Sequence, residues 1–266
     1  MVRDLEGPSR FEGHVYPQTV PEPAHVLVGA PAPWLGLDAR ERRGITLQRV
    51  EDRLRLHERH LDVAPIPGDP REMTLVRDAA ARPVTHRSAV LVALFEEEGE
   101  THVILTRRSF ALRQHRGEIA LPGGRSEPGE SAIETALREA KEEVGLEPSD
   151  VRTVGWLNPL VTFASGSAIW PVVGLLAKRP AMTVDPREVD RAFTVTLRAL
   201  MSDGAFLEER WRRDEPRPGA DADGYFPMYF FRVPGDLVWG ATARVLTELL
   251  CLVSGVDWPG AYRVWG

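Results

Sequence analysis

The stretch that decides the fold spans Gly124–Leu146 and reads GRSEPGESAIETALREAKEEVGL. Its second half predicts a helix. Ser131 and Glu134 have the spacing of a capping box, in which each side chain binds the backbone N–H of the other residue, so the helix begins at about Ser131. Gly145, with a proline three residues later, is typical of a helix end. One helix of about three turns is therefore expected here.

Two faces of this helix carry different chemistry. At about 100° per residue, its aliphatic side chains fall on one stripe that can face a core. That stripe consists of Ile133, Ala136, Leu137, Ala140 and Val144. Glu139, Glu142 and Glu143 share another face, with Arg138 on its flank. Like charges at these spacings destabilise an isolated helix by roughly a few tenths of a kcal/mol per pair. The acidic face is therefore either a solvated surface or a cation site.

The turn before the helix favours the cation site. A Pro-Gly-Gly turn ends at Gly124. Glycines let the backbone come close to a ligand, and the carbonyl of Gly124 can point at the same place as the glutamates. Hard oxygen ligands crowded at one point suit Mg²⁺ or Mn²⁺. We therefore expect one to three such ions, bound by Glu139, Glu142, Glu143 and the Gly124 carbonyl.

The frame of this stretch resembles the Nudix box, G-x5-E-x7-R-E-U-x-E-E-x-G-U with U aliphatic, which marks metal-dependent pyrophosphohydrolases. The matching residues are Gly124, Glu130, Arg138, Glu139, Glu142, Glu143, Gly145 and Leu146. The resemblance implies an α+β fold, with a mixed β-sheet sandwiched between α-helices and the box forming a loop-helix-loop. It also implies a catalytic set in which Arg138 and Glu130 orient the ligand glutamates and the loop.

A second motif lies immediately upstream of the box. Residues 104–124 read ILTRRSFALRQHRGEIALPGG. They keep the spacing of L-L-T-x-R-S-x3-R-x3-G-x3-F-P-G-G, a pattern that marks the coenzyme A pyrophosphatase branch of the Nudix hydrolases. The sequence departs from the pattern at Ile104 and at Leu121, which replaces the usual aromatic residue. The resemblance extends over about residues 86–255, and it implies substrate contacts at Arg108, Ser109, Arg113 and Gly117.

The cations of this motif suit a phosphorylated substrate. Coenzyme A carries a pyrophosphate and a 3′-phosphate, and arginine makes bidentate contacts with phosphate. The available donors are Arg107, Arg108, Arg113, His115 and Arg116. The alternative is that these side chains pair with neighbouring glutamates on the surface.

The expected reaction is the attack of water on one phosphorus of a P–O–P linkage, assisted by the bound cations. The general base is a box glutamate or an acid from the later half of the chain. Glu188, in the segment DPREVDRAF, is the first candidate outside the box, because members of the family often carry an acid before this strand. The alternative is a surface glutamate beside Arg187 and Arg191.

Three functions remain open on the sequence. The first is a coenzyme A diphosphatase that yields 3′,5′-ADP and (acyl-)4′-phosphopantetheine. The second is a pyrophosphatase for another nucleotide, such as ADP-ribose, NADH or a nucleoside triphosphate. The third is a catalytically inactive Nudix-like module for ligand sensing or protein interaction, which the intact box disfavours.

The chain divides into four expected segments. These are a Pro-rich N-terminal arm at residues 1–44, a helix with its connecting loop at 45–85, the Nudix domain at 86–258 and a tail at 259–266. The expected strands are Ser88–Glu97, Thr101–Arg108, Val151–Leu157, Ala168–Leu176, Phe193–Leu197 and Pro227–Val233. We also expect an amphipathic helix over 45–62, a polar loop over 203–224 and a final helix at Ala241–Val253.

Composition excludes some classes of partner. The net charge is −6 and the arginines are scattered among acids, so no nucleic-acid footprint is expected. No stretch approaches ~18 apolar residues and no signal-peptide core precedes the domain, so we expect no membrane partner. The one cysteine, Cys251, lies in an apolar run, which fits a reducing cytoplasm. The family resemblance leaves a homodimer open, with a small nucleotide as the main partner.

Overall fold

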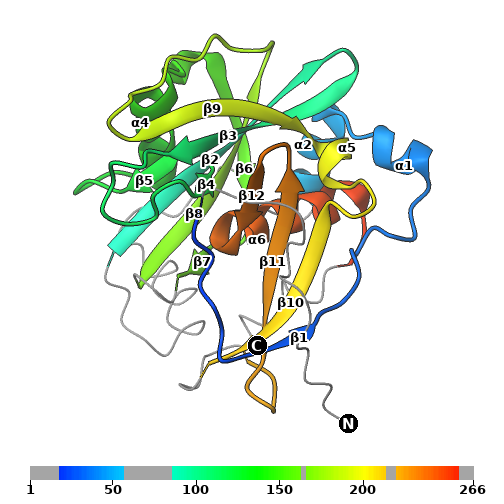
Figure 1. Cartoon of the computed structure of the whole chain (residues 1–266). Coiled ribbons are helices and arrows are strands. Elements are labelled where there is room, and N and C mark those ends of the chain that lie inside the picture. Colours follow the sequence, from blue (N-terminus) through cyan, green and yellow to red (C-terminus); the bar gives the residue numbers. More distant parts are fainter. Residues whose placement is uncertain (1–17, 57–85, 163–165, 214–219, 258–266) are drawn as a thin grey trace.

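The structure is a computed structural model that describes residues 18–56, 86–162, 166–213 and 220–257. In these residues two β-sheets and a set of helices pack together (Figure 1). Their buried side chains form three apolar clusters. The helices are α1 (Ala39–Arg43), α2 (Leu47–Leu56), α4 (Ala132–Val144), α5 (Leu197–Leu200) and α6 (Gly240–Ser254), with a 3₁₀ turn at Pro148–Asp150. The arrangement confirms the expected α+β class.

The larger sheet is mixed and has the strand order β4-β3-β2-β8-β6. Strands β5, β7 and β9 pair with β2, β8 and β3, respectively. Only the β2–β8 pair is parallel among the pairs described. The strands are β2 (His86–Glu97), β3 (Glu100–Arg108), β4 (Ile119–Ala120), β5 (Gly123–Arg125), β6 (Val151–Trp156), β7 (Leu160–Val161), β8 (Ser167–Leu176) and β9 (Val189–Thr196).

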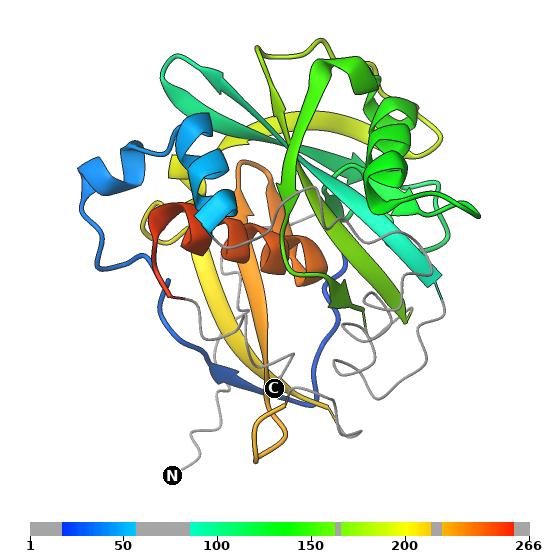
Figure 2. The ribbon, with the colours of Figure 1, turned by 180° about the vertical axis from the view of Figure 1, so that it is seen from behind.

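Both faces of strand β2 are covered, which explains its nearly continuous apolar sequence. Because successive side chains alternate between faces, Leu91 and Phe95 join the cluster under α4, whereas Val92 and Leu94 join the cluster that contains α2 and α6. The strands of the large sheet run between α4 and α6 in Figure 2. The box helix therefore lies on its own face of the sheet.

Helix α4 matches the sequence expectation closely. Ser131 is the N-cap and forms a full capping box with Glu134, and Gly145 ends the helix in the left-handed conformation with φ = 72°. The aliphatic stripe faces the sheet, with Ala136 and Val144 fully buried. Local signals alone were sufficient to place this helix.

The expected polar loop at 203–224 is wrong in its first half. Residues Phe206–Arg212 form strand β10 of a second, four-stranded sheet with the order β1-β10-β11-β12. The other strands are β1 (His25–Val28), β11 (Phe226–Val233) and β12 (Asp236–Trp239). The strand signal was hidden because an inward position is charged: Glu209 is buried and accepts a hydrogen bond of 2.6 Å from the Trp211 indole.

The described part of the N-terminal arm packs on this second sheet. Strand β1 pairs with β10, and Trp34 is buried against the rings of Phe206 and Phe231 at 5.2 and 6.1 Å. Helix α2 confirms the amphipathic pattern with Val50 and Leu54 buried. The expected end of this helix, residues 57–62, lies outside the described residues. No helix of the described chain is both long and apolar enough to cross a membrane.

Candidate active site

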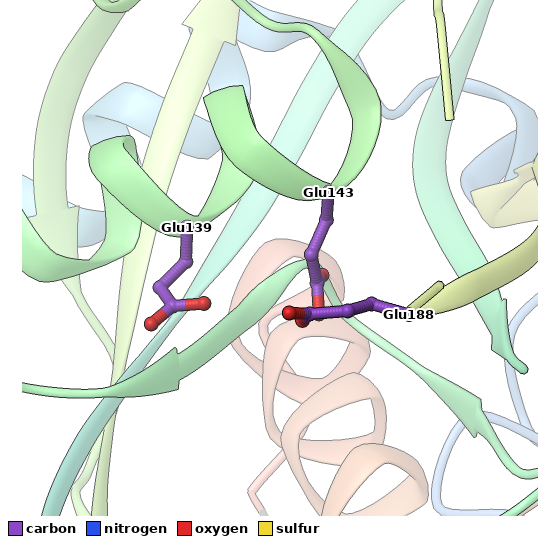
Figure 3. A group of neighbouring side chains, drawn as sticks. All are labelled: Glu139, Glu143 and Glu188. Atoms are coloured by element: carbon purple, nitrogen blue, oxygen red, sulfur yellow. The ribbon is translucent and has the colours of Figure 1, made fainter. Parts of the chain in front are cut away.

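Helix α4 and the turn before β9 bring three carboxylates together. One carboxylate oxygen each of Glu139, Glu143 and Glu188 lies within 4.8 Å of the other two. Figure 3 shows Glu139 and Glu143 pointing down from α4, with Glu188 reaching toward them from the start of β9. We call these three residues the carboxylate cluster.

The glycine turn lies directly against this cluster. The backbone N–H of Gly123 donates a hydrogen bond of 3.1 Å to Glu143 Oε2. A Cβ atom on Gly124 would lie only 2.5 Å from the Glu139 carboxylate, so a larger residue cannot occupy this position without displacing Glu139. The close approach expected from the Pro-Gly-Gly turn is therefore present.

Burial disfavours the ionised forms of Glu139 and Glu143 unless a cation is bound. It raises the pKa of Glu143 to about 7, against the opposing effects of the Gly123 N–H and Arg108. Burial also raises the pKa of Glu139, partly offset by Arg138. Within the cluster, Arg108 Nη1 approaches Glu143 Oε1 only to 3.7 Å. Crowded, desolvated carboxylate oxygens of this kind fit a hard divalent cation.

Arg138 connects the cluster to the loop. Its Nε donates to Glu130 Oε1 at 2.7 Å, and its Nη1 donates to Glu139 at 2.9 Å and to Glu142 at 3.0 Å. The hydrogen bonds that Glu130 accepts, above all the one from Arg138, hold its pKa at about 2. The spacing of Arg138 and Glu142 along the helix thus corresponds to a real contact, and Arg138 orients Glu139 as well.

Glu142 lies apart from its two neighbours on the box helix. Its side chain is 59% exposed, and it is not among the residues of the carboxylate cluster. Its role as a ligand, like that of the Gly124 carbonyl, stays a prediction.

The upstream motif frames the same region. Arg108 points to Glu143, whereas Arg113 is exposed on the loop. Ser109 is buried, and its backbone N–H donates a hydrogen bond of 2.8 Å to the Glu188 carbonyl. Gly117 has φ = +71°, and a Cβ there would lie 2.5 Å from the Phe110 ring. Ser109 and Gly117 therefore shape the loop, and their substrate contacts stay predictions.

Glu188 is held in place by backbone contacts of the preceding turn. The Asp185 N–H donates to the Glu143 carbonyl at 3.1 Å, so the turn is attached to the end of α4. Arg187 pairs with Asp185 at 2.6 Å and Arg191 pairs with Asp236, not with Glu188. The side chain of Glu188 is itself exposed, so the alternative of a surface glutamate is not excluded by these contacts. The sequence signal was the acid before the strand, and only the turn geometry brings it to α4.

Arg107 departs from the expected group of phosphate donors. Its guanidinium binds Asp236 with two contacts of 2.7 Å, on the side of the sheet facing the second β-sheet. Sequence reasoning missed Asp236 altogether, because it lies 129 residues away at the start of β12 and belongs to no motif.

Several known proteins are similar to this chain in sequence. The sequence profile described as NUDIX domain matches residues 85–215. "Nudix hydrolase 15, mitochondrial" of Arabidopsis thaliana is 38% identical over 167 residues, which cover 60% of this chain and 56% of that protein. The chain thus spans little more than half the length of this plant relative.

Two further matches differ in how much of the other protein they cover. "Uncharacterized Nudix hydrolase NudL" of Photorhabdus laumondii is 36% identical, over 61% of this chain and 82% of its own. The solved MutT/nudix family protein from Enterococcus faecalis is 15% identical, with a TM-score of 0.45, over 70% and 69% of the two chains. Because the bacterial relative is matched over most of its length, this chain belongs to the Nudix hydrolase family.

Proposed function

We propose that the protein is a divalent-metal-dependent pyrophosphohydrolase that cleaves coenzyme A or its acyl derivatives to 3′,5′-ADP and (acyl-)4′-phosphopantetheine. The observation that carries the proposal is the carboxylate cluster beside Arg108 and the glycine turn. The substrate class rests on the motif at residues 104–124, whose spacing is intact.

In this proposal Glu139, Glu142, Glu143 and the Gly124 carbonyl hold Mg²⁺ or Mn²⁺. The bound cation supplies stabilisation of charge on the phosphoryl oxygens and activation of water. Arg138 keeps Glu139 and Glu142 in orientation through its hydrogen bonds, and Glu130 anchors Arg138.

Proton transfer and substrate binding fall to other side chains. Glu188 accepts the proton of the attacking water, because its carboxylate reaches Glu139 and Glu143 from a separate element. Arg108, with one buried nitrogen (Nε) that has no hydrogen-bond partner in the described protein, binds a phosphate of the substrate together with Arg113.

The departure from the coenzyme A motif at Leu121 lies away from the carboxylate cluster. Leu121, which replaces an aromatic residue of the motif, is buried in the cluster that contains α2 and α6. Its side chain therefore packs in the core and not toward the carboxylate cluster. Hydrolysis of another nucleotide and ligand sensing without catalysis are the alternative outcomes of the test described below.

We further propose a cytoplasmic location, in line with the buried free Cys251, and a homodimer.

The test is a panel of nucleotides incubated with Mg²⁺ and with Mn²⁺: coenzyme A, acetyl-coenzyme A, ADP-ribose, NADH and a nucleoside triphosphate. We expect the two coenzyme A compounds to give the highest kcat/KM, with 3′,5′-ADP as product by chromatography. Glu143→Gln serves as the inactive control. Preference for ADP-ribose or NADH would overturn the substrate, and binding without cleavage of any compound would indicate a sensing module.

A further inference from the structure

A second group of charges lies on the other side of strand β3. The carboxylate of Asp236, the first residue of β12, is fully buried and binds two arginines. Arg107 Nη2 lies 2.7 Å from both oxygens and its Nε lies 3.0 Å from Oδ1. Arg191 Nη2 donates to Oδ2. A buried carboxylate needs such partners because its desolvation is costly.

The two arginines flank residues of the proposed site. Arg107 directly precedes Arg108, which points to Glu143, and Arg191 follows Glu188 by three positions. Both arginines belong to the β3–β9 pair, where Arg107 lies opposite Arg191. One ion-pair centre therefore holds the two strands that supply Arg108 and Glu188.

The register of these strands changes at this point. Arg107 pairs with Arg191, but the next residue, Arg108, pairs with Val189, so Asp190 is an extra residue on β9. A bulge of this kind bends the strand and redirects the side chains beyond it. Glu188 directly precedes Val189 in the sequence, so it is the side chain next to this bulge.

Without Asp236 this arrangement is electrostatically unfavourable. Like charges directly opposite each other on paired strands repel, and two guanidinium groups are opposite here. Asp190 reaches Arg107 only at 3.4 Å and is 40% exposed, so it neutralises the pair weakly. Asp236 is the described carboxylate that contacts both arginines.

We propose that Asp236 is a positioning residue of the metal site. By clamping Arg107 to Arg191 it fixes the bulge that sets Arg108 and Glu188 against Glu143. The proposal rests on the proposed function in so far as the carboxylate cluster binds a divalent cation. It also assigns a role to the second sheet. Strand β12 lies in that sheet, and its Asp236 carboxylate contacts Arg107 on strand β3 of the larger sheet.

The test compares two buried carboxylates that each pair with two arginines. Asp236→Asn removes the charge between Arg107 and Arg191, and Glu51→Gln removes a charge that α2 places between Arg55 and Arg152. Glu51 lies on neither element of the carboxylate cluster, so it is the matched control. The readouts are Mn²⁺ binding by isothermal titration calorimetry, the Mg²⁺ concentration for half-maximal activity, and Tm.

We expect both variants to lower Tm, but only Asp236→Asn to weaken Mn²⁺ binding and to raise the Mg²⁺ requirement, each by about tenfold, the loss typical of residues that orient ligands. Asp190→Asn, which alters the exposed partner of Arg107, is expected to leave both readouts near wild type. If Asp236→Asn does not fold, Arg191→Gln keeps the Asp236–Arg107 pair and is expected to weaken Mn²⁺ binding in the same direction.

The outcomes separate the two proposals. Wild-type Mn²⁺ binding in a destabilised Asp236→Asn or, failing that variant, in Arg191→Gln means a purely structural ion pair and overturns the inference. Equal weakening by Glu51→Gln means a general effect of stability and overturns it too. A wild-type protein that binds Mn²⁺ yet cleaves no nucleotide overturns the proposed function alone, since the binding comparison still stands. A wild-type protein that binds no Mn²⁺ overturns both.

Discussion

The carboxylate cluster and the Asp236 centre lie on opposite faces of one strand pair and have opposite charge balance. In the cluster three glutamates meet two arginines, Arg138 at 2.9 Å from Glu139 and Arg108 at 3.7 Å from Glu143, whereas at Asp236 one carboxylate is closely bound by two arginines. Burial raises the pKa of Glu143 to about 7, which indicates a group still in need of positive charge. This contrast indicates that a buried charge neutralised by protein side chains serves to hold the structure together, whereas a buried charge that they do not fully neutralise is available to bind a ligand.

The largest expected effect is on turnover by variants of the box. Glu143→Gln and Glu142→Gln should each lower kcat by orders of magnitude while the fold persists, because a ligand loses its charge with little change of shape. Steady-state kinetics at saturating Mg²⁺, with circular dichroism as the folding control, measure this. Near-wild-type turnover of both variants would rule out the site.

Next comes the acid outside the box. Glu188→Gln should lower kcat about 100-fold or more with little change in KM, because a general base acts on the chemical step. A rise in KM at unchanged kcat would instead assign Glu188 to substrate binding.

A smaller loss is expected at the arginine that connects the cluster to the loop. Arg138→Gln should reduce metal affinity or turnover by about tenfold, since Glu139 and Glu142 lose their common donor. Metal titrations of activity measure the effect. A silent substitution would mean that Arg138 is only a solvated charge.

Stability should respond to pH through Glu130. Its pKa is lowered to about 2 from an ordinary value of 4.5, chiefly by Arg138, so its ionised form stabilises the folded state above pH 4.5 and this contribution is lost as the pH falls toward 2. Glu130→Gln should cost about 1.5–3 kcal/mol of unfolding free energy at pH 7. Urea unfolding of the wild type and the variant should show a smaller difference in unfolding free energy at pH 3.5 than at pH 7. An equal difference at the two pH values would contradict this role of Glu130.

The smallest effect on chemistry is expected from the N-terminal arm. A chain that begins at Gly44 should keep kcat/KM within about tenfold, or roughly 1.4 kcal/mol, because residues 1–44 contribute none of the ligands. It should aggregate more readily, since Trp34 fills part of the core beside Phe206 and Phe231. A soluble, folded truncation with a larger loss would place the arm in the active site.

The sequence by itself determined the box helix and the identity of most of the proposed site. Capping residues, a C-terminal glycine and an aliphatic stripe act within one or two helical turns, so α4 could be predicted to within a residue. Short apolar runs likewise predicted most strands of the large sheet. Strand β10 escaped because the charged residue Glu209 occupies an inward position, which breaks the apolar alternation typical of a strand; in the fold it accepts a hydrogen bond from the Trp211 indole on the same strand.

Only the tertiary structure decided which acids meet. Glu188 joins Glu139 and Glu143 because backbone hydrogen bonds attach its turn to the end of α4 and to Ser109. Glu142 stays at the exposed edge although the motif treats it like its neighbour. Asp236 reaches Arg107 across 129 residues of chain. Local sequence encodes the direction of a side chain on its own helix, but contacts between elements depend on sheet register, bulges and packing, which no short pattern contains.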